Sequence, residues 1–193
     1  MTKIGDLFNE FLALCDQSRP GYRESLGRGL PRLEVEHRLK TIFKSAVDIP
    51  ELVLEIYCQV DGTLRNVADQ KLMDFIPGYR LIHLNELEEE FQKLIAIVGS
   101  SQVHNFPLLA NHSSDSVCIE SRSGNNENSI SSFLHDDPQF ELMHLNAEDF
   151  LKTVIAFYRE NVYFLDPDGF LDYDLDKQGL VGERLNNGIS YWQ

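Results

Sequence analysis

The sequence lacks several features that would point directly to a cellular location. No apolar run approaches the roughly 20 residues that a membrane-spanning helix needs. The first ten residues, MTKIGDLFNE, carry acids where an export signal has a basic and then an apolar run. The chain has only 3 cysteines, Cys15, Cys58 and Cys118, which lie far apart and form no CxxC pair. We therefore expect no membrane span, no disulfide framework and no zinc site, and we predict a protein of the reducing cytoplasm.

Basic side chains are also scarce. The 193 residues include 17 Lys and Arg against 31 Asp and Glu, which gives a net charge of −14. Because phosphate neutralisation needs clustered Lys and Arg, we expect no nucleic-acid partner. The imbalance lies after residue 50, where nine basic residues stand against twenty-four acidic ones. This acid excess either serves solubility alone or steers a basic partner to the surface.

Motifs for catalysis are missing as well. The chain has no phosphate-binding GxxxxGK[ST] or GxGxxG loop, no GxSxG nucleophile elbow and no HExxH zinc motif. Five residues could be imagined as a metal cluster: His112, Asp115, His135, Asp136 and Asp137. We prefer the alternative interpretation that they are polar residues of hairpin turns. We accordingly predict a protein that is not an enzyme and that binds no cofactor or metal.

An acidic stretch near the C-terminus partly matches a calcium-binding loop. Asp172, Asp174, Asp176 and Glu183 have the spacing of ligand positions 1, 3, 5 and 12 of such a loop. Lys177 occupies the position that requires glycine for the sharp turn. The lysine also adds a positive charge, so we do not expect calcium to bind.

Apolar residues recur at helical spacing in five segments, at about 4–18, 31–46, 50–60, 85–98 and 146–158. Asn85 and Asn146 are expected to cap the last two of these helices, each with an acid three residues later. Gly62 is expected to close the third helix in the left-handed conformation. The apolar face of the first helix needs a cover, which is more plausibly this domain than a partner chain.

Short β-prone segments follow the fourth of these helices at 106–110, 116–120, 130–134 and 140–145, and one precedes it at 79–84. The polar stretch 121–129 is expected to be a hairpin loop, and 170–173 is a possible edge strand. Because helices come first, strands next and a helix afterwards, the order predicts an α+β fold. We expect an antiparallel sheet of four to six strands flanked by N-terminal helices and a closing C-terminal helix, with 49–62 and 75–87 at the junction between helix and sheet.

Several stretches between 26 and 160 resemble, in order and spacing, the SUKH superfamily of toxin-immunity proteins, whose fungal relatives regulate cell-wall synthesis. They are LGRGLP (26–31), IPEL (49–52), LEIY (54–57), DG (61–62), FIPGY (75–79), LNEL (84–87), FPLL (106–109), DSVCI (115–119) and NAEDFL (146–151). The resemblance implies a SUKH-like α+β domain over 26–165. A helical extension over 1–25 would precede it, and an acidic segment over 166–193 would follow it.

The resemblance also implies a non-enzymatic module that neutralises a toxin by binding it, as a monomer or weak homodimer. The acid excess would suit a basic, nuclease-type toxin. The alternative is a housekeeping regulatory or scaffold module of the same fold with no toxin partner. Acids and interleaved aromatics are the candidate partner-binding residues: Glu86, Glu88, Glu89, Glu90, Asp166, Asp168, Phe170, Asp172, Tyr173, Asp174 and Asp176. A solvated acidic edge is the simpler interpretation of the same residues.

Overall fold

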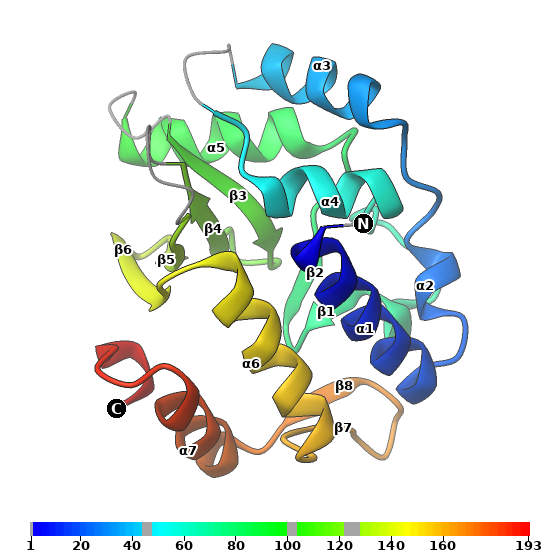
Figure 1. Cartoon of the computed structure of the whole chain (residues 1–193), viewed down its shortest axis with the longest axis vertical. Helices are drawn as coiled ribbons and strands as arrows, with labels where there is room; N and C mark the ends of the chain where they lie inside the picture. The colour runs from blue at the N-terminus through cyan, green and yellow to red at the C-terminus, as the bar shows by residue number, and fades with distance from the viewer. Residues whose placement is uncertain (1, 44–47, 100–103, 122–127) are drawn as a thin grey trace.

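The computed structural model describes residues 2–43, 48–99, 104–121 and 128–193, and it is an α+β protein, as predicted (Figure 1). Its main sheet has six antiparallel strands in the order β1-β2-β3-β4-β5-β6, so each strand pairs with its neighbour in sequence. The strands are β1 (Asp74–Ile76), β2 (Tyr79–Leu81), β3 (Asn105–Ala110), β4 (Ser116–Glu120), β5 (Ile130–Leu134) and β6 (Asp137–His144).

The strand predictions hold best in the middle of this sheet. The bounds of β4 and β5 are those predicted, whereas β6 begins three residues earlier than expected. The strand β1 was not predicted, because its three residues are too few to show an alternating pattern. The expected loop over 121–129 falls mostly on 122–127, outside the described residues.

The α-helices are α1 (Lys3–Ser18), α2 (Tyr22–Ser25), α3 (Arg32–Ile42), α4 (Glu51–Gln59), α5 (Leu87–Val98), α6 (Ala147–Arg159) and α7 (Leu175–Leu185). Short 3₁₀ helices span Gln70–Leu72 and Ser190–Trp192. The end of the second predicted helix, beyond residue 43, lies outside the described residues. None of the described helices is long and apolar enough to cross a membrane.

The apolar face of α1 is covered by the protein itself. Figure 1 shows α1 beside α6, and α1 also contacts α4. Phe8, Phe11 and Leu12 are fully buried and belong to the same core as the sheet residues. Full burial of such side chains contributes roughly 1.5–3 kcal/mol each to folding.

The predicted junction between helix and sheet is formed by direct hydrogen bonds. The buried hydroxyl of Tyr57 in α4 donates to the carbonyl oxygen of Ile82, 2.7 Å away. Helix α4 ends at Gln59, before Gly62. Gly62 has φ of +93°, and a Cβ there would lie 2.5 Å from the carbonyl oxygen of Ile82. Glycine is therefore needed because two backbone segments meet, rather than to close the helix.

The two predicted asparagine caps have different outcomes. The side chain of Asn146 accepts a hydrogen bond of 2.9 Å from the backbone N–H of Asp149, which confirms it as the cap of α6. The prediction for Asn85 is wrong, since α5 begins at Leu87 and has no side-chain cap. The side-chain oxygen of Asn85 instead accepts a hydrogen bond of 3.3 Å from the Arg38 guanidinium of α3.

A hairpin and a last helix follow α6. Strands β7 (Tyr163–Leu165) and β8 (Leu171–Tyr173) pair with each other as a separate two-stranded sheet. The segment expected at 170–173 is thus a strand, but it does not extend the main sheet. Asp174 caps α7 by accepting the backbone N–H of Lys177 at 3.1 Å. A helix therefore occupies most of the stretch that had the calcium-loop spacing.

Candidate functional site

The predicted partner-binding residues form two separate groups. Glu86, Glu88, Glu89 and Glu90 lie at the start of α5, whereas the candidates from Asp166 to Asp176 lie on the β7–β8 hairpin and the first turn of α7. Figure 1 places these two groups toward opposite ends of the molecule. A single continuous acidic rim is therefore absent from the described structure, and each group is considered separately.

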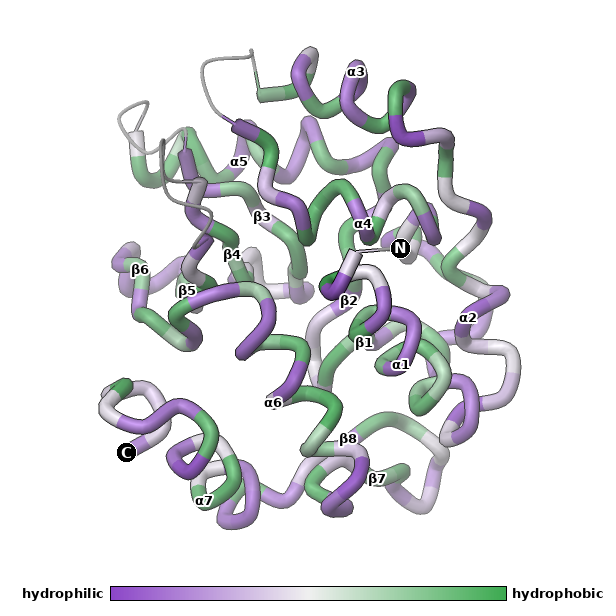
Figure 2. The backbone as a smooth tube through the Cα atoms, in the orientation of Figure 1, coloured by the Kyte–Doolittle hydropathy of each residue, from purple (hydrophilic) through white to green (hydrophobic). Residues whose placement is uncertain are grey.

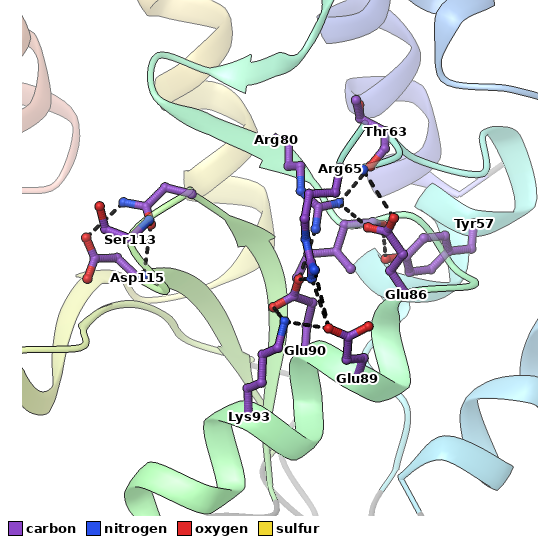
Figure 3. A network of polar contacts seen from close by, with 12 residues as sticks. Tyr57, Thr63, Arg65, Arg80, Glu86, Glu89, Glu90, Lys93, Ser113 and Asp115 are labelled. Carbon is purple, nitrogen blue, oxygen red and sulfur yellow. Dashed lines mark hydrogen bonds and ion pairs between the residues drawn. The ribbon is translucent and has the colours of Figure 1, made fainter. Parts of the chain in front are cut away.

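The first group belongs to a network of paired charges, called here the arginine network: Arg65, Arg80, Glu86, Glu89, Glu90 and Lys93. Figure 3 shows Arg65 and Arg80 together at its centre with carboxylates beside them. Arg65 pairs with Glu89 and Glu90, and the hydrogen bond from Arg65 to Glu90 raises the pKa of the guanidinium. Lys93 pairs with Glu89 at 2.6 Å, and this contact lowers the pKa of that carboxyl group.

Arg80 is the buried member of the arginine network. Its side chain is only 4% exposed and forms ion pairs with Glu86 at 2.8 Å and with Glu90 at 3.0 Å. The guanidinium also donates to the carbonyl oxygen of Thr63, 2.7 Å away. Its buried donors thus have acceptors, as a buried guanidinium requires. These contacts tie β2, α5 and the segment after α4 together.

The arginine network balances its own charge, with three cations against three carboxylates. A pocket of about 180 Å³ beside it is lined by Arg65, Arg80, Glu90, Lys93 and His112, among other residues. Because the arginines and Lys93 are already paired with carboxylates, the pocket offers an anion little uncompensated charge. We assign this group a structural role. Glu88 is exposed and takes no part in the ion pairs of this network among the described residues.

The second group is built on the β7–β8 hairpin. Asp166 forms its turn, because one carboxylate oxygen accepts the backbone N–H groups of Asp168 and Phe170 at 2.9 and 2.8 Å. Phe164 and Asp172 are partners across the two strands, so both side chains point to the same face. Both are exposed. The hairpin therefore presents an aromatic ring beside a carboxylate.

The acids of this region exceed the cations that could pair with them. Residues 160–193 hold seven acids and two cations, Lys177 and Arg184, and the ammonium of Lys71 lies over the Phe170 ring at 5.9 Å. Lys177 pairs with Asp174, and Arg184 pairs with Glu160. Asp168, Asp172 and Asp176 are exposed and have no ion pair within the described part of the chain. This end of the molecule carries uncompensated negative charge.

Large apolar side chains lie among these acids. Figure 2 shows hydrophobic and hydrophilic residues interleaved along β7, β8 and α7. Leu175 and Leu180 are 69% and 70% exposed, and the outer edge of the hairpin adds aromatic rings. We call the whole set the C-terminal surface: Phe164, Leu165, Asp168, Phe170, Asp172, Tyr173, Leu175, Asp176, Leu180 and Leu185.

Half of this surface was missed at the sequence level. Leu175, Leu180 and Leu185 recur at intervals of five residues, which does not follow one helical face closely, and Gly179 and Gly182 weaken the helical pattern further. The cap Asp174 was the available signal for α7, because an acid before an apolar residue is a helix-start pattern.

The conceivable metal cluster lies on two neighbouring hairpin turns, between β3 and β4 and between β5 and β6. Asp115 accepts the backbone N–H of His135 at 2.9 Å with one oxygen and the Asn111 amide at 2.8 Å with the other. Within the described ranges, no group of three or more His, Cys, Asp or Glu side chains is arranged to hold a metal ion.

Comparison of the chain with protein-family models and with curated proteins finds no match to either. The resemblance to the SUKH superfamily therefore stays a prediction.

Proposed function

We propose that this chain is a non-enzymatic protein-binding module that docks a basic protein on its C-terminal surface. One observation carries the proposal: exposed carboxylates without ion-pair partners alternate there with exposed apolar side chains. Aromatic and leucine side chains supply the area that a partner would cover, and the acids supply charge complementarity. The resemblance to SUKH proteins suggests the class of the partner, a basic nuclease-type toxin. This chain would neutralise the toxin by occupying its active surface.

The test compares two variants that lose the same charge. The first carries Asp168→Asn, Asp172→Asn and Asp176→Asn; the matched control carries Asp6→Asn, Glu24→Gln and Asp136→Asn, which are exposed acids elsewhere. The tagged full chain is used to capture a partner from its own cells, and the partner is then purified. We expect association with the first variant to be slower by on the order of tenfold at low salt, and with the control to match the wild type.

Equal association of all three proteins would overturn the proposal that this surface docks the partner. Nuclease activity of the purified partner decides its class. Inhibition by the wild-type chain, weakened in the first variant, supports the immunity role. A partner without nuclease activity favours the regulatory or scaffold module instead.

A further inference from the structure

A small aromatic pocket opens beside the C-terminal surface. It has a volume of about 100 Å³ and lies between the sheet, α6, the β7–β8 hairpin and the 3₁₀ helix at the C-terminus. We call it the tyrosine pocket, because Tyr79, Tyr163, Tyr173 and Tyr191 line it, with Trp192 and His144. Tyr173 and Tyr191 are 39% and 36% exposed at its mouth, whereas Tyr163 and His144 are buried. Tyr173 belongs to the C-terminal surface as well, so the two are continuous.

The hydrogen bonds of Asn186 settle the protonation of His144. The Asn186 amide nitrogen donates to the carbonyl oxygen of Gly182 at 3.0 Å and to the hydroxyl of Thr153 at 3.0 Å. Because a carbonyl oxygen can only accept, this identifies the nitrogen, and the other Asn186 atom is the oxygen. That oxygen lies 2.8 Å from Nδ1 of His144. Nδ1 therefore carries the proton.

The remaining ring nitrogen of His144 is then an acceptor. Burial lowers the pKa of His144 to about 4, so the imidazole is neutral near pH 7. Its Nε2 has no hydrogen-bond partner among the described residues, although only 1% of the residue is exposed. A ligand that donates a hydrogen bond would satisfy this acceptor.

The tyrosine hydroxyls are in a similar position. Tyr163 is 5% exposed, and no hydrogen bond to its hydroxyl occurs among the described residues. Burial raises the pKa of Tyr163 well above its usual value and that of Tyr79 to about 12, so both phenols are neutral. Burial and then the nearby Glu141 also raise the pKa of Tyr191. The pocket thus holds neutral oxygen acceptors, with a carboxylate near its mouth.

The aromatic rings and the charge around the pocket favour a cation. No Lys or Arg is among the described residues that line it. The indole N–H of Trp192 is already used, since it donates to the carbonyl oxygen of Met143 at 2.7 Å. Trp192 therefore offers only its ring, with the Phe157 and Tyr191 rings at centroid distances of 5.8 and 4.8 Å. Aromatic rings grouped in this way attract ammonium and guanidinium groups.

We propose that the tyrosine pocket receives one arginine or lysine side chain of the basic protein that docks on the C-terminal surface, an inference that rests on the proposed function. The volume of about 100 Å³ is well below the roughly 300–1,000 Å³ of pockets that take whole small-molecule ligands, which favours part of one side chain as the occupant. The head group of the side chain would donate to Nε2 of His144 and to the Tyr163 hydroxyl, with its charge against the aromatic rings.

The single tryptophan of the chain makes the test direct, because Trp192 lines the pocket and no second tryptophan contributes to the emission. Butylguanidinium is titrated into the full chain, with butylurea as the neutral probe of nearly the same shape. We expect a saturable change in Trp192 emission with butylguanidinium and binding of butylurea that is at least about tenfold weaker. Equal binding of the two probes, or binding of neither, would overturn the inference.

Two variants localise the binding. Tyr173→Ala removes a ring from the mouth and is expected to weaken butylguanidinium binding by about tenfold. Phe164→Ala is the control, because Phe164 has similar exposure on the same hairpin but does not line the pocket. Equal losses in the two variants would contradict the assignment.

If butylguanidinium fails to bind while the Asp168, Asp172 and Asp176 variant still loses its partner, the pocket inference alone is wrong. If that variant keeps its partner, the docking proposal is wrong.

Discussion

Gly182 of α7 lies directly against the indole ring of Trp192. A Cβ atom built on this glycine would lie 2.2 Å from Cε3 of the indole and 2.6 Å from its Cδ2. No real Cβ tolerates such a contact, so the helix backbone and the ring pack face to face only because the side chain is absent. The contact holds the C-terminal residues, and with them the floor of the tyrosine pocket, onto α7.

We therefore expect Gly182→Ala to destabilise the protein by roughly 2 kcal/mol, because overpacking displaces the indole. The matched control is Gly179→Ala in the same helix, where an added Cβ meets nothing within 4 Å. That substitution should stabilise the protein by up to about 1 kcal/mol through helix propensity. Urea unfolding followed by Trp192 emission measures both, and a Gly182→Ala variant as stable as Gly179→Ala would contradict the packing.

Arg80 provides a second prediction. Arg80→Met removes the buried guanidinium from its contacts with Glu86, Glu90 and the Thr63 carbonyl. Loss of one partner of a buried ion pair costs about 3–5 kcal/mol in unfolding free energy. Arg65→Met is the control, since the Arg65 side chain is 39% exposed and surface pairs contribute less than about 1 kcal/mol. Equal losses would mean that the network lacks the buried centre described above.

The two asparagines allow a test of helix capping within one protein. Asn146→Ala removes the hydrogen bond to the Asp149 N–H and should cost about 1 kcal/mol. Asn85→Ala removes only an exposed bond from Arg38, so its effect should stay within about 0.5 kcal/mol. Chemical denaturation of both variants checks the difference. A larger loss for Asn85→Ala would show that it caps α5 in solution.

The same pair shows where prediction from sequence succeeds. The hydrogen bond that makes Asn146 a cap is local, because its acceptor and the N–H of Asp149 lie three residues apart. Asn85 has equivalent spacing to Glu88, but Glu86 is held by Arg80 and Arg65, and the helix begins later. Contacts between residues distant in sequence override a local pattern, and no periodicity reveals them.

Prediction of the site had the same limit. The acids of the hairpin were identified from composition alone, yet only the structure distinguishes the neutralised Glu90 from the unpaired Asp172. The tyrosine pocket was missed entirely. Its walls come from the sheet, α6, the β7–β8 hairpin, α7 and the C-terminus, so no single stretch of sequence carries a signal for it.

His144 should make stability depend on pH in a defined window. Burial lowers its folded pKa to about 4 from the ordinary histidine value of about 6.5, so between these values the unfolded chain binds the additional proton. The stabilisation is complete above about pH 6.5 and is lost as the pH falls toward 4, by up to about 3 kcal/mol. His144→Gln lacks this titration, so the stability of the wild type relative to the variant should decrease between pH 7 and pH 4.5. The carboxyl groups titrate in both proteins, so their effects on stability cancel in the difference. A constant difference would contradict the buried neutral imidazole.

The contact between α1 and α6 has a consequence for synthesis of the chain. The thiol of Cys15 donates to the Tyr158 hydroxyl across 143 positions of sequence, and Phe11 packs on the same tyrosine. At about 5–20 residues per second, the ribosome needs on the order of 10 seconds to supply α6 after α1 has emerged. During that interval one apolar side of α1 has no permanent cover. We therefore expect the nascent chain to expose this side of α1 to chaperones until α6 has emerged.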